Sequence, residues 1–420
     1  MTTLTPPTPA TQPTSQVTRA VQAVQATQAI QAARMEADAP DPVPFVDLGA
    51  QQREIDAEVQ AGLRRVFDTT AFIGGPDVQA FEKEYASFIE VSDCVGVGNG
   101  TDALELALRA AGVVPGGEVI LPANTFIATA EAVSRIGAVP VLVDVDPQFL
   151  LIDPEAALAA LTARTQAVMP VHLYGQTAFV ERIRPQAERA GVAVIEDAAQ
   201  SQGAFRHGRM AGSLGLAAGT SFYPGKNLGA AGDAGAVMTN DPELAARVRV
   251  LGEHGSPSKY RHSTVGMNSR LDTVQAVVLR AKLARLDRWN EGRRAAAARY
   301  AELLRPLADS GDVWLPTAAQ GNHHVWHLYT VQLENRDAVL EALRAAGIGA
   351  GVHYPVPVHL TGAYEHLSLT RGAFPVTEAA ADRLLSLPIF PHITVEQQER
   401  VVAALGRAVG RSRSTSVATP

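Results

Sequence analysis

Lys226 stands in the stretch SFYPGKNLG, residues 221–229, where a Pro-Gly pair follows a short apolar run. Pro and Gly mark turns, so one interpretation makes Lys226 the solubilising tip of a surface turn. The other interpretation is a lysine held in a pocket, where its amine attacks a carbonyl. That chemistry requires a desolvated site with partner groups. The polar residues that follow other apolar runs decide between the two.

Glycines follow a second apolar run in GNGTDALELAL, residues 98–108. We expect a helix to begin there, with Thr101 or Asp102 as its cap. A helix N-terminus presents free backbone N–H groups and a positive dipole end, so it suits a phosphate. An ordinary capped helix is the alternative. The glycines run G-x-G-x-G and not G-x-G-x-x-G, which argues against a dinucleotide-binding turn.

Two more runs end in groups that suit a flat ring. Phe126, in PANTFIATA, can stack on a planar ring or simply pack in the core. Asp197, in IEDAAQSQGA, follows apolar residues, and a buried carboxylate requires a partner. Asp197 can keep a pyridine nitrogen protonated, or only cap a helix. Gln200, three residues later, can donate a hydrogen bond to a ring oxygen.

One ligand explains all of these groups. Ser221 can donate to a phosphate, although this stretch is not a P-loop: Thr220 stands where a P-loop has glycine, and Asn227 follows the lysine. A phosphate, a flat ring, a ring nitrogen that needs an acid and an aldehyde that needs an amine together describe pyridoxal 5'-phosphate. The sequence therefore predicts this cofactor, with Lys226 as the amine.

These residues require strands and helices that bring them to one edge of a sheet. Short apolar runs alternate with helical stretches, which predicts an α/β fold with a seven-stranded, mostly parallel sheet between helices. Ligands of such sheets bind at the carboxyl ends of the strands. The expected strands are 94–98, 118–123, 139–145, 167–174, 192–198, 219–224 and 235–240.

A smaller α/β unit is expected towards the C-terminus. A long helical stretch, 272–307, precedes strands near 325–333 and 348–354, and a helix ends near Val409. We predict a disordered low-complexity extension, a large cofactor-binding domain, a small C-terminal domain and a flexible tail. Their ranges are 1–42, 43–290, 291–410 and 411–420.

Composition limits the class of protein. The chain has 420 residues, with 36 basic and 43 acidic side chains and a net charge of -7, so it offers no electrostatic footprint for nucleic acid. The single cysteine, Cys94, cannot form an internal disulfide, which favours a reducing compartment. The sequence contains no run of 18 apolar residues, the length needed to span a membrane. No cluster of His, Cys or acidic residues has convincing metal-ligand spacing. We expect a cytoplasmic protein with no metal.

Six motifs resemble those of the DegT/DnrJ/EryC1/StrS family of sugar aminotransferases, which have the aspartate-aminotransferase fold (fold type I). In chain order they are GNGTDAL, PANTFIAT, VHLYGQ, EDAAQSQGA, SFYPGKNLGAAGDAGAV and GMNSRLDTVQAVVL. Each motif is weak alone, but six in order at familiar spacings are specific. The resemblance covers about residues 43 to 409.

The resemblance implies a role for each matching residue. Lys226 resembles the Schiff-base lysine that carries protons, and Asp197 resembles the partner of the pyridine nitrogen. Asn268 resembles an asparagine that reaches the phosphate in the neighbouring subunit, which implies a homodimer with shared active sites. The remaining implied cofactor contacts are Gly100, Thr101, Asp102, Phe126, Gln200 and Ser221.

The substrate is implied by a second segment, GVHYPVPVHLTGAYEHL, residues 351–367. It is similar to the segment that enters the active site of family members acting at C-3 of nucleotide-linked keto sugars. By position, His353, Tyr354 and Tyr223 then contact the substrate, whereas a strand end before a Pro turn is the alternative. The expected reaction transfers the amino group of L-glutamate to a dTDP-3-keto-6-deoxyhexose, for an aminosugar of an antibiotic-like metabolite or a surface polysaccharide.

Other functions compete with this one. A C-4 aminotransferase of a dTDP-, UDP- or GDP-linked 4-keto-6-deoxysugar is the nearest alternative. A regulatory protein that binds the cofactor without catalysis is another, although the sequence shows no helix-turn-helix or basic patch. Related dehydratases replace the lysine by histidine, so Lys226 argues against that chemistry.

Overall fold

The computed structural model describes residues 41–416, with the backbone alone for 411–416. The predicted extension, residues 1–42, therefore lies outside the described residues except for Asp41 and Pro42. Residues from Val43 onward form one compact unit. The predicted domain boundary at 290/291 falls inside helix α10 (Leu286–Leu303), and this division of the chain stays a prediction.

The centre of the unit is the predicted seven-stranded sheet, in the order β1-β9-β8-β5-β4-β2-β3. Strand β9 runs antiparallel to both of its neighbours, and the other strands run in one direction. Six strand ends therefore meet at the same edge. The bounds are β1 Asp93–Val97, β2 Glu118–Pro122, β3 Val139–Val143, β4 Thr165–Val168, β5 Ala193–Asp197, β8 Ala217–Ser221 and β9 Gly235–Thr239.

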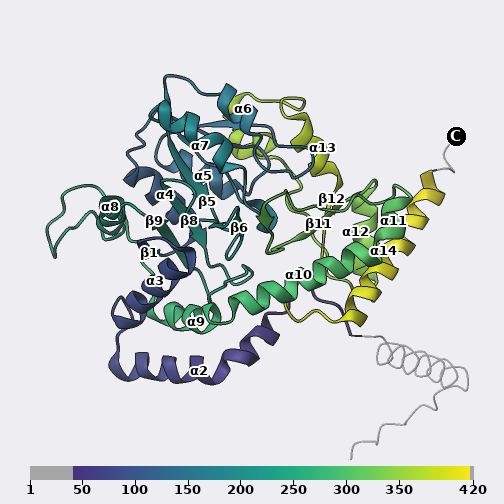
Figure 1. The fold of residues 1–420 in the computed structure, drawn as a ribbon, viewed down its shortest axis with the longest axis horizontal. Coiled ribbons are helices and arrows are strands. Elements are labelled where there is room, and N and C mark those ends of the chain that lie inside the picture. The colour runs from purple at the N-terminus through teal and green to yellow at the C-terminus, as the bar shows by residue number, and fades with distance from the viewer. Residues whose placement is uncertain (1–40, 417–420) are drawn as a thin grey trace, which may run out of the picture. The chain divides into compact units, whose positions relative to one another are not determined.

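The strands form where they do because their apolar runs are covered on both faces. Strands β2 and β9 are buried along their whole length, as expected of a sheet between two layers of helices. Helix α4 lies against β8 and β9 on one face (Figure 1). The helices of this part are α2 Leu48–Thr69, α3 Pro76–Ile89, α4 Gly100–Ala110, α5 Ile127–Arg135, α6 Pro154–Ala159, α7 Val180–Arg189 and α8 Pro242–Gly252.

The C-terminal part is a smaller α/β layer. Helix α9 (Thr273–Leu283) still packs against α2 and α3 of the first part. The helices of the C-terminal part are α10, α11 Arg305–Asp309, α12 Arg336–Ala345, α13 Pro375–Arg383 and α14 Val395–Ser416. Strands β11 (Tyr329–Gln332) and β12 (Leu384–Leu387) pair antiparallel. The short elements that remain are β6 Phe205–Arg206, β7 Arg209–Met210, β10 Asn322–His323, and the 3₁₀ turns Leu173–Gly175, Val358–Leu360 and Gly362–Leu367.

Two expectations for the C-terminal part need correction. Residues 348–354 do not form a strand; they make only isolated bridges, at Ile348 and at Gly351. Pro355 and Pro357 follow at once and lack the N–H that a strand interior requires. The partner of β11 is instead β12, and the last helix continues past Val409 to Ser416.

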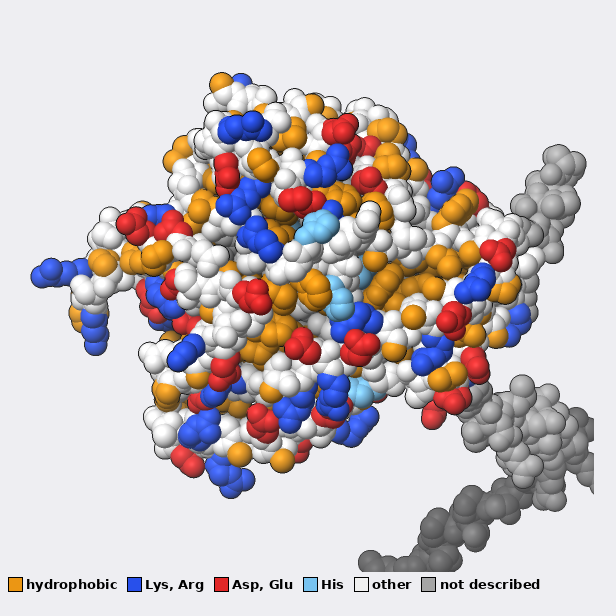
Figure 2. Space-filling view, in the orientation of Figure 1, with side chains coloured by type: hydrophobic (Ala, Val, Ile, Leu, Met, Phe, Trp, Pro, Cys, Tyr) orange, Lys and Arg blue, Asp and Glu red, His pale blue; other side chains and the backbone are white. Residues whose placement is uncertain are grey.

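Within the described range, no helix combines the length and apolarity needed to cross a membrane. The described side chains include no group of three or more His, Cys, Asp or Glu that could hold a metal ion. On the face shown in Figure 2, basic and acidic side chains are interspersed, without a large area of one sign.

Candidate active site

A cavity of about 620 Å³ lies at the shared carboxyl ends of the strands. Its walls come from the ends of β1, β2, β5 and β8 and from C-terminal segments around residues 327 and 353. Most of the residues that the sequence singles out line it together, although they are far apart in the chain. They are Gly100, Thr101, Phe126, Asp197, Gln200, Ser221, Tyr223, Lys226, His353 and Tyr354.

Lys226 lies in a tight turn just past β8, where its backbone N–H donates to the carbonyl of Tyr223 at 2.8 Å. The next residue fixes this turn, because the side-chain amide of Asn227 donates to Asn290 Oδ1 on α10 at 2.9 Å. Burial lowers the pKa of Lys226 to about 8, and the Asp197 carboxylate opposes this shift. Lys226 is therefore a desolvated lysine facing a cavity, and the interpretation as a surface turn is wrong.

Asp197 is the last residue of β5, and both of its carboxylate oxygens accept hydrogen bonds. Oδ2 accepts from the hydroxyl of Thr129 at 2.7 Å, and Oδ1 accepts from the backbone N–H of Ala199 at 3.1 Å. A carboxylate has about four acceptor sites, so two donors leave capacity facing the cavity. Asp197 does not cap a helix, which settles the alternative that its position left open.

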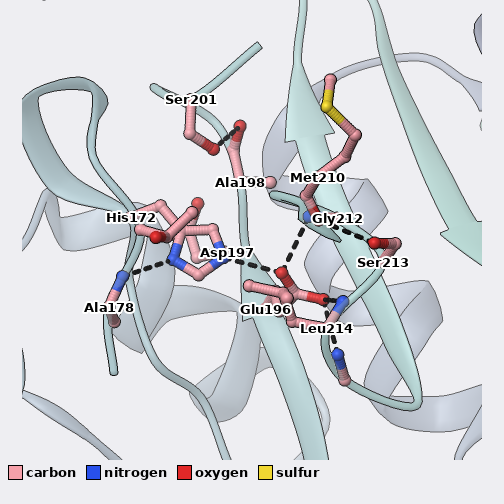
Figure 3. Close-up of polar contacts among 12 residues, drawn as sticks. His172, Ala178, Glu196, Asp197, Ala198, Ser201, Met210, Gly212, Ser213 and Leu214 are labelled. Carbon is pink, nitrogen blue, oxygen red and sulfur yellow. Dashed lines mark hydrogen bonds and ion pairs between the residues drawn. The ribbon is translucent and has the colours of Figure 1, made fainter. Parts of the chain in front are cut away.

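The neighbouring residue, Glu196, anchors the same strand from the other side (Figure 3). Its fully buried carboxylate accepts from the ring of His172 and from three backbone amides of residues 212–215, each at 2.7 Å. The Nδ1 atom of His172 accepts from the N–H of Ala178 at 3.0 Å. The ring proton is therefore on Nε2, which donates a hydrogen bond to Glu196. The main chain of His172 also donates to the carbonyl of Asp197 at 3.0 Å. His172, to which the sequence assigns no role, thus holds the strand end that carries Asp197.

Helix α4 begins at Gly100, and its cap is neither Thr101 nor Asp102. The cap is Asn99, whose Oδ1 accepts from the backbone N–H of Asp102 at 2.8 Å. The Asp102 carboxylate accepts from Ser269 Oγ at 2.7 Å and from Arg135 at 3.1 Å, and it does not line the cavity. A cofactor contact by Asp102 is therefore the weakest of the predicted contacts.

The start of α4 and the end of β8 approach each other closely. A Cβ atom on Gly100 would lie 2.6 Å from the Cβ of Ser221, so this position requires glycine. The first N–H groups of a helix have no partner within the helix, and they attract anions. With the hydroxyl of Ser221 beside them, the amides of Gly100 and Thr101 form a suitable cradle for a phosphate.

An aromatic pair covers another wall of the cavity. The rings of Phe126 and Tyr354 lie 5.3 Å apart, and Phe126 is 52% exposed. Gln200 donates to the Tyr354 hydroxyl at 3.0 Å and accepts from the N–H of Tyr174 at 2.7 Å. Burial, together with the charge of Lys226, lowers the pKa of His353 to about 4, so this imidazole is neutral near pH 7.

The structure adds residues that the sequence did not assign. Thr129 and His327 both line the cavity. His327 Nδ1 lies 3.1 Å from Asn227 Oδ1, and burial followed by the nearby charge of Lys226 holds the pKa of His327 well below its ordinary value. Thr129 follows Phe126 by three residues in PANTFIATA, but nothing in the sequence alone indicates that it meets Asp197.

Asn268 lies outside the cavity of its own chain. It is exposed and forms an isolated bridge with Glu253. Its predicted partner is the phosphate of a neighbouring subunit, so its role stays a prediction.

The arrangement fits pyridoxal phosphate. The start of α4 and Ser221 suit its phosphate, Asp197 suits its ring nitrogen, and Lys226 suits its aldehyde. Gly100 supports this fit independently, because a side chain there would fill the anion cradle.

Comparisons with known proteins agree with this interpretation of the cavity. A model of the DegT/DnrJ/EryC1/StrS aminotransferase family matches residues 53–406. A dTDP-3-amino-3,4,6-trideoxy-alpha-D-glucose transaminase from Streptomyces venezuelae is 48% identical, over 86% of this chain and 95% of its own. A UDP-N-acetyl-3-dehydro-alpha-D-glucosamine 3-aminotransferase from Acidithiobacillus ferrooxidans is 46% identical, over 87% of this chain and 98% of its own.

Two solved structures extend the comparison. DesV from S. venezuelae, in complex with a ketimine intermediate, superposes with a TM-score of 0.85 and 47% identity, over 88% of this chain and 99% of that one. NtdA from Bacillus subtilis, with bound cofactor PMP, has a TM-score of 0.81 and 32% identity, over 88% and 86% of the two chains.

Proposed function

This chain belongs to the DegT/DnrJ/EryC1/StrS aminotransferase family, and we propose that it transfers the amino group of L-glutamate to C-3 of a nucleotide-linked keto-deoxysugar. The chain is a sugar aminotransferase, and its family depends on pyridoxal phosphate. The observation that carries the proposal is the meeting of Lys226, Asp197 and the anion cradle of Gly100, Thr101 and Ser221 in one cavity.

The chemistry divides between the cofactor and the chain. When bound, pyridoxal phosphate supplies an aldehyde for amines and a ring that accepts electrons from the substrate's Cα. Lys226 moves a proton between substrate and cofactor, which requires its neutral form; burial makes that form accessible near pH 8. Asp197 holds a proton on the ring nitrogen by charge pairing, and Gln200 orients the ring oxygen. Amine and ketone change places between donor and acceptor, so no external oxidant or reductant is needed.

The substrate class rests on the relatives and on one wall of the cavity. The S. venezuelae relative is named for a dTDP-linked 3-amino sugar, and the A. ferrooxidans relative for 3-amination of a UDP-linked sugar. Position C-3 is common to both names, whereas the nucleotide differs. We assign C-3 amination to this chain, with dTDP-3-keto-6-deoxyhexose as the preferred substrate. Tyr223, His353 and Tyr354 are its proposed contacts.

The site also favours a homodimer. Lys226 is the only lysine or arginine among the described residues that line the cavity, yet glutamate and a nucleotide diphosphate are both anions. Exposed Asn268 is the residue proposed to reach the phosphate from a second copy of the chain.

The first test compares Lys226, which is partly buried, with Lys282, which is buried. Burial lowers the pKa of both Lys226 and Lys282 to about 8, but only Lys226 lines the cavity. We expect wild type and Lys282→Met to show absorbance near ~420 nm with pyridoxal phosphate and to lose it on addition of glutamate. Lys226→Met should show neither behaviour. A wild-type protein without this band after reconstitution would overturn the proposed function.

A second test identifies the carbon that receives nitrogen. The wild-type enzyme is given glutamate with a dTDP-3-keto-6-deoxyhexose or a dTDP-4-keto-6-deoxyhexose, and the product is analysed by NMR. Amination of the 3-keto sugar is expected, and exclusive turnover of the 4-keto sugar would replace the proposal with C-4 amination.

A further inference from the structure

A short chain of hydroxyl groups leads to Asp197 from Thr125, just before helix α5, and from Thr129 in its first turn. The hydroxyl oxygens of Thr125 and Thr129 lie 2.7 Å apart, and Thr129 Oγ1 lies 2.7 Å from Asp197 Oδ2. The side chains are at most 5% exposed, with Thr129 completely buried, and all three residues line the cavity.

The direction of this chain follows from hydrogen-bond chemistry. An ionised carboxylate is an acceptor only, so Thr129 must donate its single proton to Asp197. Thr129 Oγ1 is then an acceptor for the hydroxyl proton of Thr125. A charge-assisted hydrogen bond of this kind is short and roughly twice as strong as a neutral one.

We propose that Thr129 is a positioning residue for Asp197. A carboxylate rotates readily about its last bond, because that torsion has only broad preferences. Thr129 holds Oδ2 and the N–H of Ala199 holds Oδ1 at 3.1 Å, so the plane of the carboxylate is fixed from both sides. The remaining acceptor sites then face the cavity in one orientation. The inference rests on the proposed function, since it concerns how Asp197 meets the cofactor's ring nitrogen.

Loss of the Thr129 hydroxyl would also leave the Asp197 carboxylate with one donor fewer. Hydrogen bonds donated to a carboxylate stabilise its ionised form, and loss of a donor in a buried site favours the neutral form. A neutral Asp197 could not hold a proton on the ring nitrogen by charge pairing. Removal of the Thr129 hydroxyl should therefore act on the cofactor through Asp197.

A purely structural role would have a different signature. Thr129 lies in the first turn of α5, and a buried hydroxyl requires a partner wherever it lies. Thr239 is a matched control: it is 2% exposed, donates to the carbonyl of Leu216 at 2.7 Å, and does not line the cavity. Both Thr→Val changes remove one buried hydroxyl, but only Thr129→Val removes it from Asp197.

The experiment measures pyridoxal phosphate binding and the absorbance of the bound cofactor as a function of pH. Thr129→Val should bind pyridoxal phosphate about 10-fold more weakly, because a hydrogen bond to a charged group is lost. On acidification, the pH midpoint at which the absorbance of the bound cofactor changes should lie higher in this variant than in wild type. Thr129→Ser keeps the hydroxyl and should restore both properties, and Thr239→Val should leave both as in wild type.

Thr125→Val removes the hydroxyl that lies one hydrogen bond further from Asp197. It leaves Thr129 in place, so it tests the proposal even if Thr129→Val does not fold. It should move both properties in the same direction by a smaller factor. If Thr129→Val folds and matches wild type in affinity and pH profile, or if Thr129→Ser fails to restore them, the positioning role is overturned. Wild-type protein that binds no pyridoxal phosphate would instead remove the proposed function itself.

Discussion

Asp197 and Glu196 are consecutive buried carboxylates on β5, and they face opposite sides of the sheet. Glu196 accepts four hydrogen bonds, from the ring of His172 and from three amides of residues 212–215. Asp197 accepts two, and it lines the cavity beside Lys226. The side chains share chemistry, strand and depth, but they differ in how many donors surround them.

This difference separates a structural carboxylate from a chemical one. A buried charge is tolerated when donors satisfy it, and Glu196 is satisfied on every side. Asp197 is satisfied only in part by the chain, so its remaining acceptor capacity is directed at a ligand. Donor count, rather than burial, therefore distinguishes the two carboxylates, and it agrees with the proposed contact between Asp197 and the cofactor.

The largest effect is expected at Asp197. Asp197→Asn keeps the shape but removes the charge, and kcat should fall on the order of 10³-fold because preorganised electrostatic stabilisation is lost. The thermal midpoint should change little, since the N–H of Ala199 can still donate to the amide oxygen and the Thr129 hydroxyl can rotate to accept from the amide N–H₂. Steady-state kinetics with a keto sugar and thermal unfolding are the measurements. A kcat within a few-fold of wild type would end the distinction between the two carboxylates.

The opposite pattern is expected at Glu196. Glu196→Gln places an N–H₂ group against buried donors that lose their acceptor, so the free energy of unfolding should fall by about 3 kcal/mol. The remaining folded enzyme should keep most of its kcat. Urea unfolding measures the loss, with exposed Glu188→Gln as control, where an ion pair to Arg184 contributes less than about 1 kcal/mol. Loss of kcat without loss of stability would contradict this assignment.

The pH dependence of Lys226 tests the Asp197 side of the comparison. Its folded pKa of about 8 lies below the unfolded value of 10.5. The unfolded chain therefore binds more protons between these values, and Lys226 makes the unfolding free energy rise with pH across that window. In cofactor-free protein, Lys226→Met should flatten this rise. Labelling of Lys226 by an amine-reactive reagent should increase through about pH 8, with exposed Lys83 as the reference, and a midpoint near 10.5 would show that Lys226 is not desolvated.

The smallest effect is expected at the aromatic wall. Tyr354→Phe removes the acceptor of Gln200 and a proposed sugar contact, so KM for the keto sugar should rise by up to about 10-fold with little change in kcat. Tyr364→Phe is the control, because its hydroxyl meets Ser134 at 3.2 Å and Tyr364 does not line the cavity. Equal kinetics for both variants would remove Tyr354 from the substrate contacts.

Much of this architecture can be predicted from the sequence, for a physical reason. Strands buried on both faces appear as apolar runs between turn residues, so the seven strands of the central sheet are legible. Because the carboxyl ends of parallel strands share an edge, the sequence alone is enough to place residues such as Asp197 and Lys226 together.

The rest depends on contacts between distant segments. Asn99, Thr101 and Asp102 are all capping residue types, and only the exact end of β1 decides that Asn99 is the cap. Strand β12 has four residues and is defined by its pairing with β11, which lies far away in the sequence. Likewise, the sequence does not reveal that Thr129 meets Asp197, because this contact depends on the rotation of α5 against the sheet.

The close approach at Gly100 has a consequence for protein engineering. Replacing a helical glycine by alanine commonly stabilises a protein by about 0.5–1 kcal/mol. In α14, Gly406 is open to this change, because a Cβ there would meet no atom within 4 Å. At Gly100 the same methyl would press against Ser221 and close the anion cradle. Engineering for thermostability can therefore replace Gly406 by alanine, but it must keep Gly100.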